Sequence, residues 1–372
     1  MSFEDTLRDG TLRWTQATAG GWPRSSANSF TPFQPENVVA VCGAFHFWDS
    51  WPLLTDNGNL FDAGSGTELW FALAAPISVL PDDRHSVARI HLLEWRDGVF
   101  RTLGPAIPDG LSPGSREWSG CATIESNQRV TLMFTAAGYR GAQTAGYEQR
   151  LFRAFARLAN GALTEWSAAD EFIVADGVEY QLANQPTGQP GRIKAFRDPD
   201  YFRDPANGSE WVVFTGSSAR LPGTYDGVIG LARLDGDART TLFPPLIDAT
   251  GFNNELERPH LRCFDGKYYV FWTTQAYVFA EPDTAGPTGL YGAVANSATG
   301  CWELLNGNGL VAANPPEEPG QAYSWLVLPD RRVTSFVDQW GIRSADGARF
   351  GGTFAPFASL RITGSRAIVR HD

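Results

Sequence analysis

A short unit that recurs five times constrains the fold of this chain more than any other sequence feature. Each copy has a polar or charged cluster, a short strand, a tight turn and a second apolar strand. With Asp49, Ser119, Asp198, Glu257 and Ser324 as markers, successive copies are 59 to 79 residues apart. That spacing suits one four-stranded blade per copy, with insertions, and it predicts an all-β, five-bladed β-propeller with a central funnel-shaped active site.

Turn signals between the apolar runs support this prediction. Asn207-Gly208 and Asp265-Gly266 each separate two runs that are typical of strands, so we expect hairpins there. Only residues 2–14 and a few loops have a helical pattern. We therefore predict a single catalytic propeller domain over residues 1–372, in which residues 1–39 form an N-terminal lead-in with a short helix.

Charge and apolar patterning exclude several classes of function. The net charge is −11 and the basic residues are scattered, so nucleic acid and membrane surfaces are not expected partners. The N-terminus lacks the pattern of a secretory signal, so we expect leaderless or unconventional export to the extracellular space, with a cytoplasmic location as the alternative. The four cysteines form no CxxC pair, so we expect buried free thiols, no metal site and no cofactor. A monomer is expected.

In a propeller, the innermost strands of all blades start at the same end of the channel. Residues that open each unit therefore converge, and we expect five of them around one funnel: Asp49, Trp118, Asp198, Glu257 and Tyr323. The alternative is that such clusters only cap strands. Three carboxylates in the same register favour a site.

Cleavage of a glycosidic bond requires at least two carboxyl groups that face each other across the site. Asp49 lies among tryptophans that exclude water, which suits an ionised nucleophile held in place by neighbouring donors. Glu257 follows Glu255 by two residues, and a like charge that close raises one carboxyl pKa, as a general acid requires. Asp198, after Arg197, can bind sugar hydroxyls and favour positive charge on the ring.

Aromatic residues supply the apolar part of a sugar site. Trp48, Trp51 and Trp118 stand at blade starts, where sugar faces can stack on them. The tryptophans of second strands are expected in the core, namely Trp70, Trp211 and Trp272. His46 and His260 are expected to have structural roles.

The motifs WDSWP, EWSG, FRDP, ELERPH with FDGKYYVF, and QAYSW occur in the order found in glycoside hydrolase family 68, the levansucrases and their relatives. The resemblance runs from about residue 40 to about residue 365. It implies a propeller that acts on sucrose with retention of configuration and transfers the fructosyl unit to water or to a sugar acceptor.

By this resemblance Asp49 attacks the anomeric carbon, Asp198 stabilises the transition state, and Glu257 is the acid and then the base. The positions that match the fructose pocket are Trp48, Trp118, Ser119 and Arg197. Glu255 and Tyr323 match positions near the glucose side.

Three positions depart from the family pattern. Asn254 replaces an aspartate that helps to bind calcium in some members, which argues against a calcium site. Gln275 replaces an Arg or His found in many polymer-forming members, and we expect mainly hydrolysis or short transfer products. The alternative is that the loop 278–289 sets acceptor choice. Thr215 replaces a glutamate.

Three other functions are compatible with the sequence. The first is a predominantly hydrolytic β-fructofuranosidase of the same family. The second is an arabinan-cleaving hydrolase of the same architecture, against which WDSWP and EWSG argue. The third is a sugar-binding propeller without catalysis, which would normally lack one of the three carboxylates.

Overall fold

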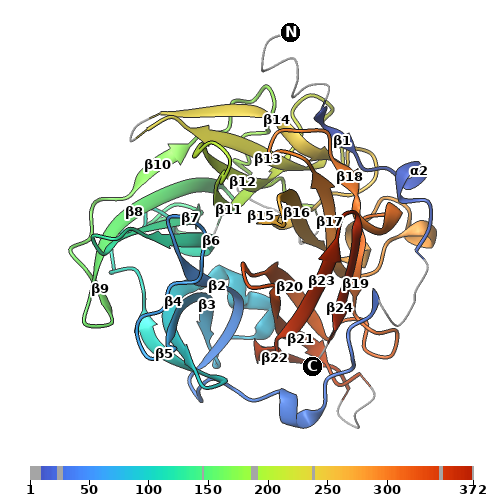
Figure 1. Ribbon diagram of the computed structural model, residues 1–372. Helices are drawn as coiled ribbons and strands as arrows, with labels where there is room; N and C mark the ends of the chain where they lie inside the picture. Colours follow the sequence, from blue (N-terminus) through green and yellow to red (C-terminus); the bar gives the residue numbers. More distant parts are fainter. Residues whose placement is uncertain are drawn as a thin grey trace.

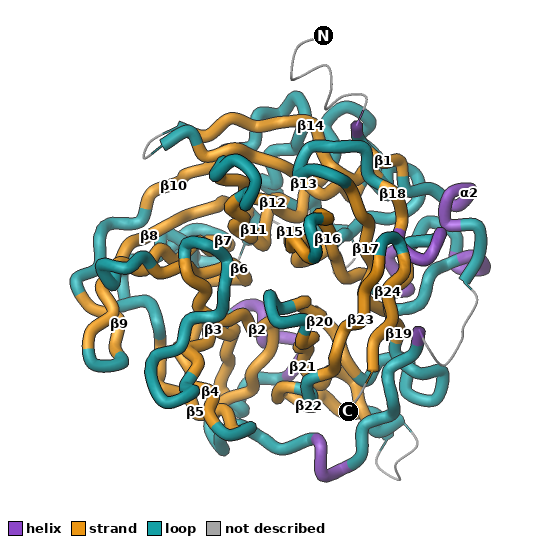
Figure 2. The backbone as a smooth tube through the Cα atoms, in the orientation of Figure 1, coloured by secondary structure: helices purple, strands orange, loops and turns teal. Residues whose placement is uncertain are grey.

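Five blades of mainly antiparallel strands stand radially around a central channel in the computed structural model (Figure 1). Parallel pairing between the inner strands of the first two blades joins these blades into one nine-stranded sheet. The structure describes residues 10–22, 28–144, 146–185, 192–236, 239–342 and 347–370. The tube in Figure 2 shows the same arrangement, with strands dominating and helical turns confined to the periphery and the connections. The prediction of an all-β, five-bladed propeller is confirmed.

The first three blades follow the chain order of the repeats. Blade I comprises β2 (Phe45–Thr55), β3 (Glu68–Pro76), β4 (Arg89–Arg96) and β5 (Val99–Pro105). Blade II comprises β6 (Arg116–Ile124), β7 (Arg129–Ala137), β8 (Gln149–Ala159), β9 (Ala162–Thr164) and β10 (Asp170–Ile173). Blade III comprises β11 (Phe196–Arg203), β12 (Glu210–Ser217), β13 (Gly227–Leu234) and β14 (Thr240–Asp248).

In each of the last two blades, as in blade II, one strand pairs along one of its edges with two strands instead of one. Blade IV comprises β15 (Glu257–Phe264), β16 (Lys267–Thr274), β17 (Gly289–Ala295), β18 (Glu303–Leu304) and β19 (Leu310–Ala313). Blade V comprises β20 (Ala322–Val327), β21 (Arg332–Trp340), β22 (Arg349–Phe354), β23 (Ala358–Thr363) and β24 (Arg366–Arg370). The innermost strands are β2, β6, β11, β15 and β20, each of which opens a predicted repeat.

The N-terminal segment runs along the outside of the blades. β1 (Leu12–Arg13) pairs in parallel with β14, and the four-residue helix α2 (Gln16–Ala19) follows it. Part of the predicted helix over residues 2–14 is therefore wrong, because Leu12–Arg13 is a strand; residues 2–9 lie outside the described residues. Trp14 anchors the segment, fully buried with its ring 5.1 Å from that of Trp272.

A later part of the segment binds blade V. The Phe33 amide donates to the side chain of Gln321 (2.9 Å), and the Trp340 indole donates to the Phe33 carbonyl (3.2 Å). These bonds tie residues before blade I to the last blade, so the lead-in helps to close the ring of blades.

The predicted turns and core tryptophans are present. Asp265 and Gly266 both have positive φ (51° and 75°), as a two-residue hairpin turn between β15 and β16 requires. The second-strand tryptophans Trp70, Trp211 and Trp272 are buried. Trp51 is also buried and stacks on Phe71 (ring centroids 6.0 Å apart), so its expected place in the sugar site is wrong.

All four cysteines are free, but only Cys121 is buried, and Cys301 is exposed. The described part of the chain has no helix long and apolar enough to cross a bilayer.

Candidate active site

A β-bulge interrupts the innermost strand of every blade at the same point. At four of the five bulges the second residue has positive φ: Asp49, Asp198, Arg258 and Ser324. A bulge lets two successive residues face the same way, whereas a regular strand would turn the second one to the opposite face. Each inner strand therefore offers the channel a pair of side chains.

These five pairs line one cavity of about 520 Å³ at the centre of the propeller. In chain order the pairs are Trp48 and Asp49, Trp118 and Ser119, Arg197 and Asp198, Glu257 and Arg258, and Tyr323 and Ser324. The five residues predicted to converge all lie on this wall. The predicted register is wrong for blade IV, because Glu257 is the first residue of its pair whereas Asp49 and Asp198 are the second.

Asp49 is positioned by its neighbours in blades I and II. The Ser119 hydroxyl donates a hydrogen bond of 2.7 Å to Asp49 Oδ2. Trp48 is fully buried beside it. One carboxylate oxygen is thus fixed by a hydroxyl while an aromatic wall limits access of water.

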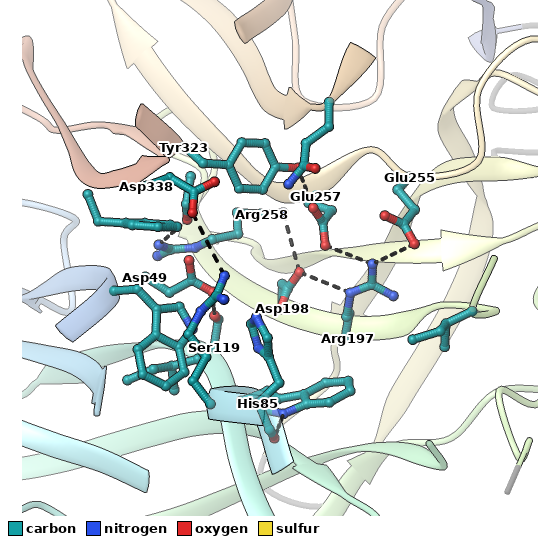
Figure 3. Close-up of a pocket in the computed structure, with 18 of the residues that line it drawn as sticks. Asp49, His85, Ser119, Arg197, Asp198, Glu255, Glu257, Arg258, Tyr323 and Asp338 are labelled. Carbon is teal, nitrogen blue, oxygen red and sulfur yellow. Dashed lines mark hydrogen bonds and ion pairs between the residues drawn. The ribbon is translucent and has the colours of Figure 1, made fainter. Parts of the chain in front are cut away.

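Arg197 connects three carboxylates from blades III and IV (Figure 3). Its Nη2 lies 2.8 Å from Glu257 Oε1 and 3.6 Å from Glu255 Oε1, and its Nε lies 3.6 Å from Asp198 Oδ2. One guanidinium cannot neutralise three carboxylates. The excess negative charge of the cluster therefore favours protonation of one of its carboxyl groups.

Two of these carboxyl groups have perturbed pKa values. Burial raises the pKa of Asp198 to about 7, against the opposing effect of Arg197, and the charges of Glu257 and Asp49 raise it further. Burial also raises the pKa of Glu255 to about 7, assisted by the charge of Glu257. The sequence analysis expected one raised pKa in the Glu255 and Glu257 pair, and the structure assigns it to Glu255.

Asp198 accepts hydrogen bonds from two groups that the sequence analysis did not connect with it. Thr215 Oγ1 donates to Asp198 Oδ2 (3.2 Å), which gives a place to the threonine that departs from the family pattern. The backbone amide of Arg258 donates to the same oxygen (3.4 Å). The Asp198 side chain is thereby held between blades III and IV.

Glu257 is held from two sides. Arg197 donates to Oε1, and the Tyr323 hydroxyl donates to Oε2. Burial raises the pKa of Tyr323 well above its usual value, and the charge of Glu257 raises it further, so the phenol keeps its proton. Glu257 is therefore fixed while its carboxyl group faces the cavity.

Sequence reasoning missed several wall residues. Arg84 and His85 belong to a 3-10 turn, Pro81–Ser86, and Asp338 to β21. His85 contacts the rings of Trp48 and Trp118, and burial, followed by the charge of Arg84, lowers its pKa well below the usual value. These residues lie outside the inner strands, so the repeat gave no signal for them.

Arg258 was also missed, although it stands inside the ERPH motif. Its guanidinium donates to Ser324 Oγ (2.9 Å) and to the Ser50 carbonyl (3.0 Å), so it links blades IV, V and I. The repeated bulge register would have found it, because it occupies the same position as Asp49.

The cavity mouth carries Gln275 and Tyr277. Gln275 directly follows β16 and is partly buried, and Tyr277 is 61% exposed. His46 and His260 are not on the wall; His260 is buried and accepts a hydrogen bond from the Val327 amide, which agrees with a structural role. Among the described residues, no group of three His, Cys, Asp or Glu side chains is arranged to hold a metal ion.

Comparison with known proteins places this geometry in context. The family profile described as Levansucrase/Invertase matches residues 6–228 and 224–372. The chain is 32% identical to a levansucrase of Pseudomonas savastanoi pv. glycinea over 415 aligned positions, covering 100% of this chain and 92% of the relative. A levansucrase of Rahnella aquatilis is 29% identical, with 96% and 93% of the two chains covered.

Solved structures give the same result. An inulosucrase from Halalkalicoccus jeotgali bound to kestose superposes with a TM-score of 0.87 at 30% identity, covering 96% of this chain and 95% of that one. The β-fructofuranosidase catalytic domain of Microbacterium saccharophilum superposes with a TM-score of 0.84 at 25% identity, covering 99% and 92%. The similarity therefore extends over the whole propeller.

Proposed function

Since the chain belongs to the levansucrase/invertase family, we propose that it cleaves sucrose by a double displacement in which Asp49 carries the fructosyl unit. The observation that carries this proposal is the meeting of Asp49, Asp198 and Glu257 on one cavity wall, from three different blades. A merely structural role does not require three carboxylates to share a cavity.

In the first half-reaction an Asp49 oxygen forms a bond to the anomeric carbon of the fructosyl unit. The bond from that carbon to the glycosidic oxygen breaks, and Glu257 gives its proton to that oxygen, so glucose leaves. The Ser119 hydrogen bond leaves the second oxygen of Asp49 as the attacking atom. Asp198 stabilises positive charge that develops on the ring.

The proton for this step is supplied by the cluster around Arg197. Three carboxylates and one guanidinium carry an excess of negative charge, and two members have pKa values of about 7. A proton shared within the cluster is therefore available to Glu257 near neutral pH. Tyr323 and Arg197 keep Glu257 oriented during the transfer.

In the second half-reaction Glu257 takes a proton from the acceptor, whose oxygen attacks the anomeric carbon and releases Asp49. The two inversions together retain the configuration. Water as the acceptor gives fructose, and a sugar as the acceptor gives a transfer product. Gln275 offers an acceptor sugar two donors and one acceptor but no charge, so hydrolysis and short products are favoured over long fructan.

The test is to incubate the protein with sucrose and to measure free glucose and free fructose separately, with Asp49→Asn as the control. We expect glucose release that exceeds fructose release by a modest margin and falls by at least about a thousandfold in the control. Equal amounts mean hydrolysis alone. No release of either sugar from the wild type would contradict the proposal.

A further inference from the structure

Arg84 and Asp338 form an oppositely charged pair on the cavity wall to which neither the repeats nor the mechanism assigns a role. Arg84 comes from the 3-10 turn between β3 and β4 of blade I. Asp338 comes from β21 of blade V, at a point where the pairing with β22 shifts between Val337 and Gln339. The extra residue at this shift lies in β22, and β21 keeps its regular alternation, so Asp338 faces the cavity together with Phe336 two residues earlier.

The Arg84 side chain is held firmly without using its full hydrogen-bonding capacity. Nη1 donates to the carbonyl of Pro81 (2.7 Å). The guanidinium lies over the rings of Phe350 (4.4 Å) and Trp48 (5.7 Å), which fix its plane. Nη2 faces Asp338 Oδ1 at 4.0 Å, which is too long for a hydrogen bond.

Asp338 is a mostly buried carboxylate without a hydrogen-bond donor. Its side chain is 18% exposed, and the described residues donate no hydrogen bond to it. Its partner at 4.0 Å supplies charge only. Buried carboxylates normally accept several hydrogen bonds, so one that lacks them on the wall of a binding cavity is suited to accept them from a ligand.

The environment of Asp338 agrees with this reading. Burial raises the pKa of Asp338 to about 6, against the opposing effect of Arg84, and the charge of Asp49 raises it further. In Figure 3 Asp338 lies on the side of the cavity where Asp49 lies, and Glu255 lies on the opposite side.

We propose that Asp338, oriented by Arg84, accepts a hydrogen bond from a hydroxyl group of the fructosyl unit that is bound next to Asp49. This inference rests on the proposed function. The fructosyl side is favoured because Arg84 packs on Trp48, the residue that precedes Asp49, and because Asp338 lies on the Asp49 side of the cavity. Asp338 is thus a binding residue for the unit that is transferred.

The first experiment compares Asp338→Asn with Asp170→Asn, a matched control in an Arg–Asp pair on blade II that does not line the cavity. The donors are sucrose and raffinose, which share the fructosyl unit and differ only beyond the glucosyl unit. A hydrogen bond to a charged group corresponds to about a 10- to 100-fold change. We expect that loss of kcat/KM in Asp338→Asn, equal for both donors, and no loss in the control.

A second measurement uses sucrose analogues that each lack one hydroxyl of the fructosyl unit. With the wild type, kcat/KM for the analogue without the contacted hydroxyl falls by a similar factor. With Asp338→Ala, which removes both acceptor oxygens, the same analogue loses nothing further. Thermal unfolding checks that the variants fold. If Asp338→Asn does not fold, Arg84→Lys provides a second probe, because it keeps the positive charge but lacks the planar guanidinium group.

Wild-type kcat/KM in Asp338→Asn, a loss with sucrose but not with raffinose, or full additivity for every analogue would each overturn the inference. A failure of the proposed function can be distinguished from a failure of this inference, because the wild type itself would then release no glucose from sucrose.

Discussion

At the scale of single residues, the charge around Arg197 links catalysis to stability. Arg197 faces Asp198, Glu255 and Glu257 at 3.6, 3.6 and 2.8 Å. Burial of these carboxylates raises two of their pKa values above those of the unfolded chain. At these two carboxyl groups the folded state binds more protons than the unfolded state between about pH 4 and pH 7, so their contribution to stability falls as pH rises through this range.

We predict that Asp198→Asn stabilises the protein while it abolishes turnover. At pH 8 the wild type must bury the Asp198 charge, and the amide removes that cost, so the free energy of unfolding should rise by about 1–3 kcal/mol. At pH 4 the native carboxyl group is protonated and the difference should nearly vanish. Denaturant unfolding at both pH values measures this. A variant less stable than the wild type at pH 8 would show that Asp198 is a net stabilising group.

Gln275 belongs to the same scale, because one side chain at the mouth changes what an acceptor meets. We predict that Gln275→Arg lengthens the transfer products from concentrated sucrose and that Gln275→His does so less, since a guanidinium makes charge-assisted bonds to hydroxyl groups. Product lengths can be compared by size-exclusion chromatography. Abundant long fructan from the wild type, or unchanged lengths in both variants, would instead favour the loop 278–289 as the determinant.

At the scale of elements, the bulge in each inner strand is what builds the site. Gly120 follows Ser119 at the bulge of β6, and a Cβ atom there would lie 1.9 Å from the Met133 carbonyl oxygen of β7. Only glycine lets the two strands approach so closely. The bulge that turns Ser119 toward Asp49 thus depends on a residue that never touches substrate.

We predict that Gly120→Ala costs about 3 kcal/mol or more of stability and lowers kcat, because the backbone of β7 must move and Ser119 moves with it. The control is Gly43→Ala, where a Cβ would meet nothing within 4 Å and the cost should stay within about 0.5 kcal/mol. Thermal unfolding and sucrose turnover measure both effects. Equal stability of the two variants would refute the role given to Gly120.

The same elements show what sequence could and could not predict. The five repeats, the turn at Asp265-Gly266 and the convergence of Asp49, Asp198 and Glu257 follow from local strand and turn patterns. The one-residue offset of Glu257 could not be predicted from these patterns, because the position of a bulge depends on how the strand pairs with the next strand. Arg84 and Asp338 come from a loop and from a second strand, so only closure of the ring brings them to the cavity.

At the scale of the whole molecule, the ring of blades joins groups that lie far apart in the chain. Asp49 comes from blade I and Glu257 from blade IV, and both face one cavity that Arg258 braces from blade IV to blades V and I. The lead-in ties blade V to the segment before blade I through Phe33. Catalysis therefore depends on closure of the ring, since no single blade contains the nucleophile and the acid.

The central claim is that Asp49 carries the fructosyl unit, and trapping that ester tests it most directly. In Glu257→Gln, fructosyl fluoride needs no acid for its leaving group, whereas release of the ester still lacks its base, so the intermediate should accumulate. Mass spectrometry of the acid-quenched, digested protein should then find one added fructosyl unit on the peptide with Asp49, and none in Asp49→Asn with Glu257→Gln. An adduct on another residue, or turnover to a product of inverted configuration, would contradict the account.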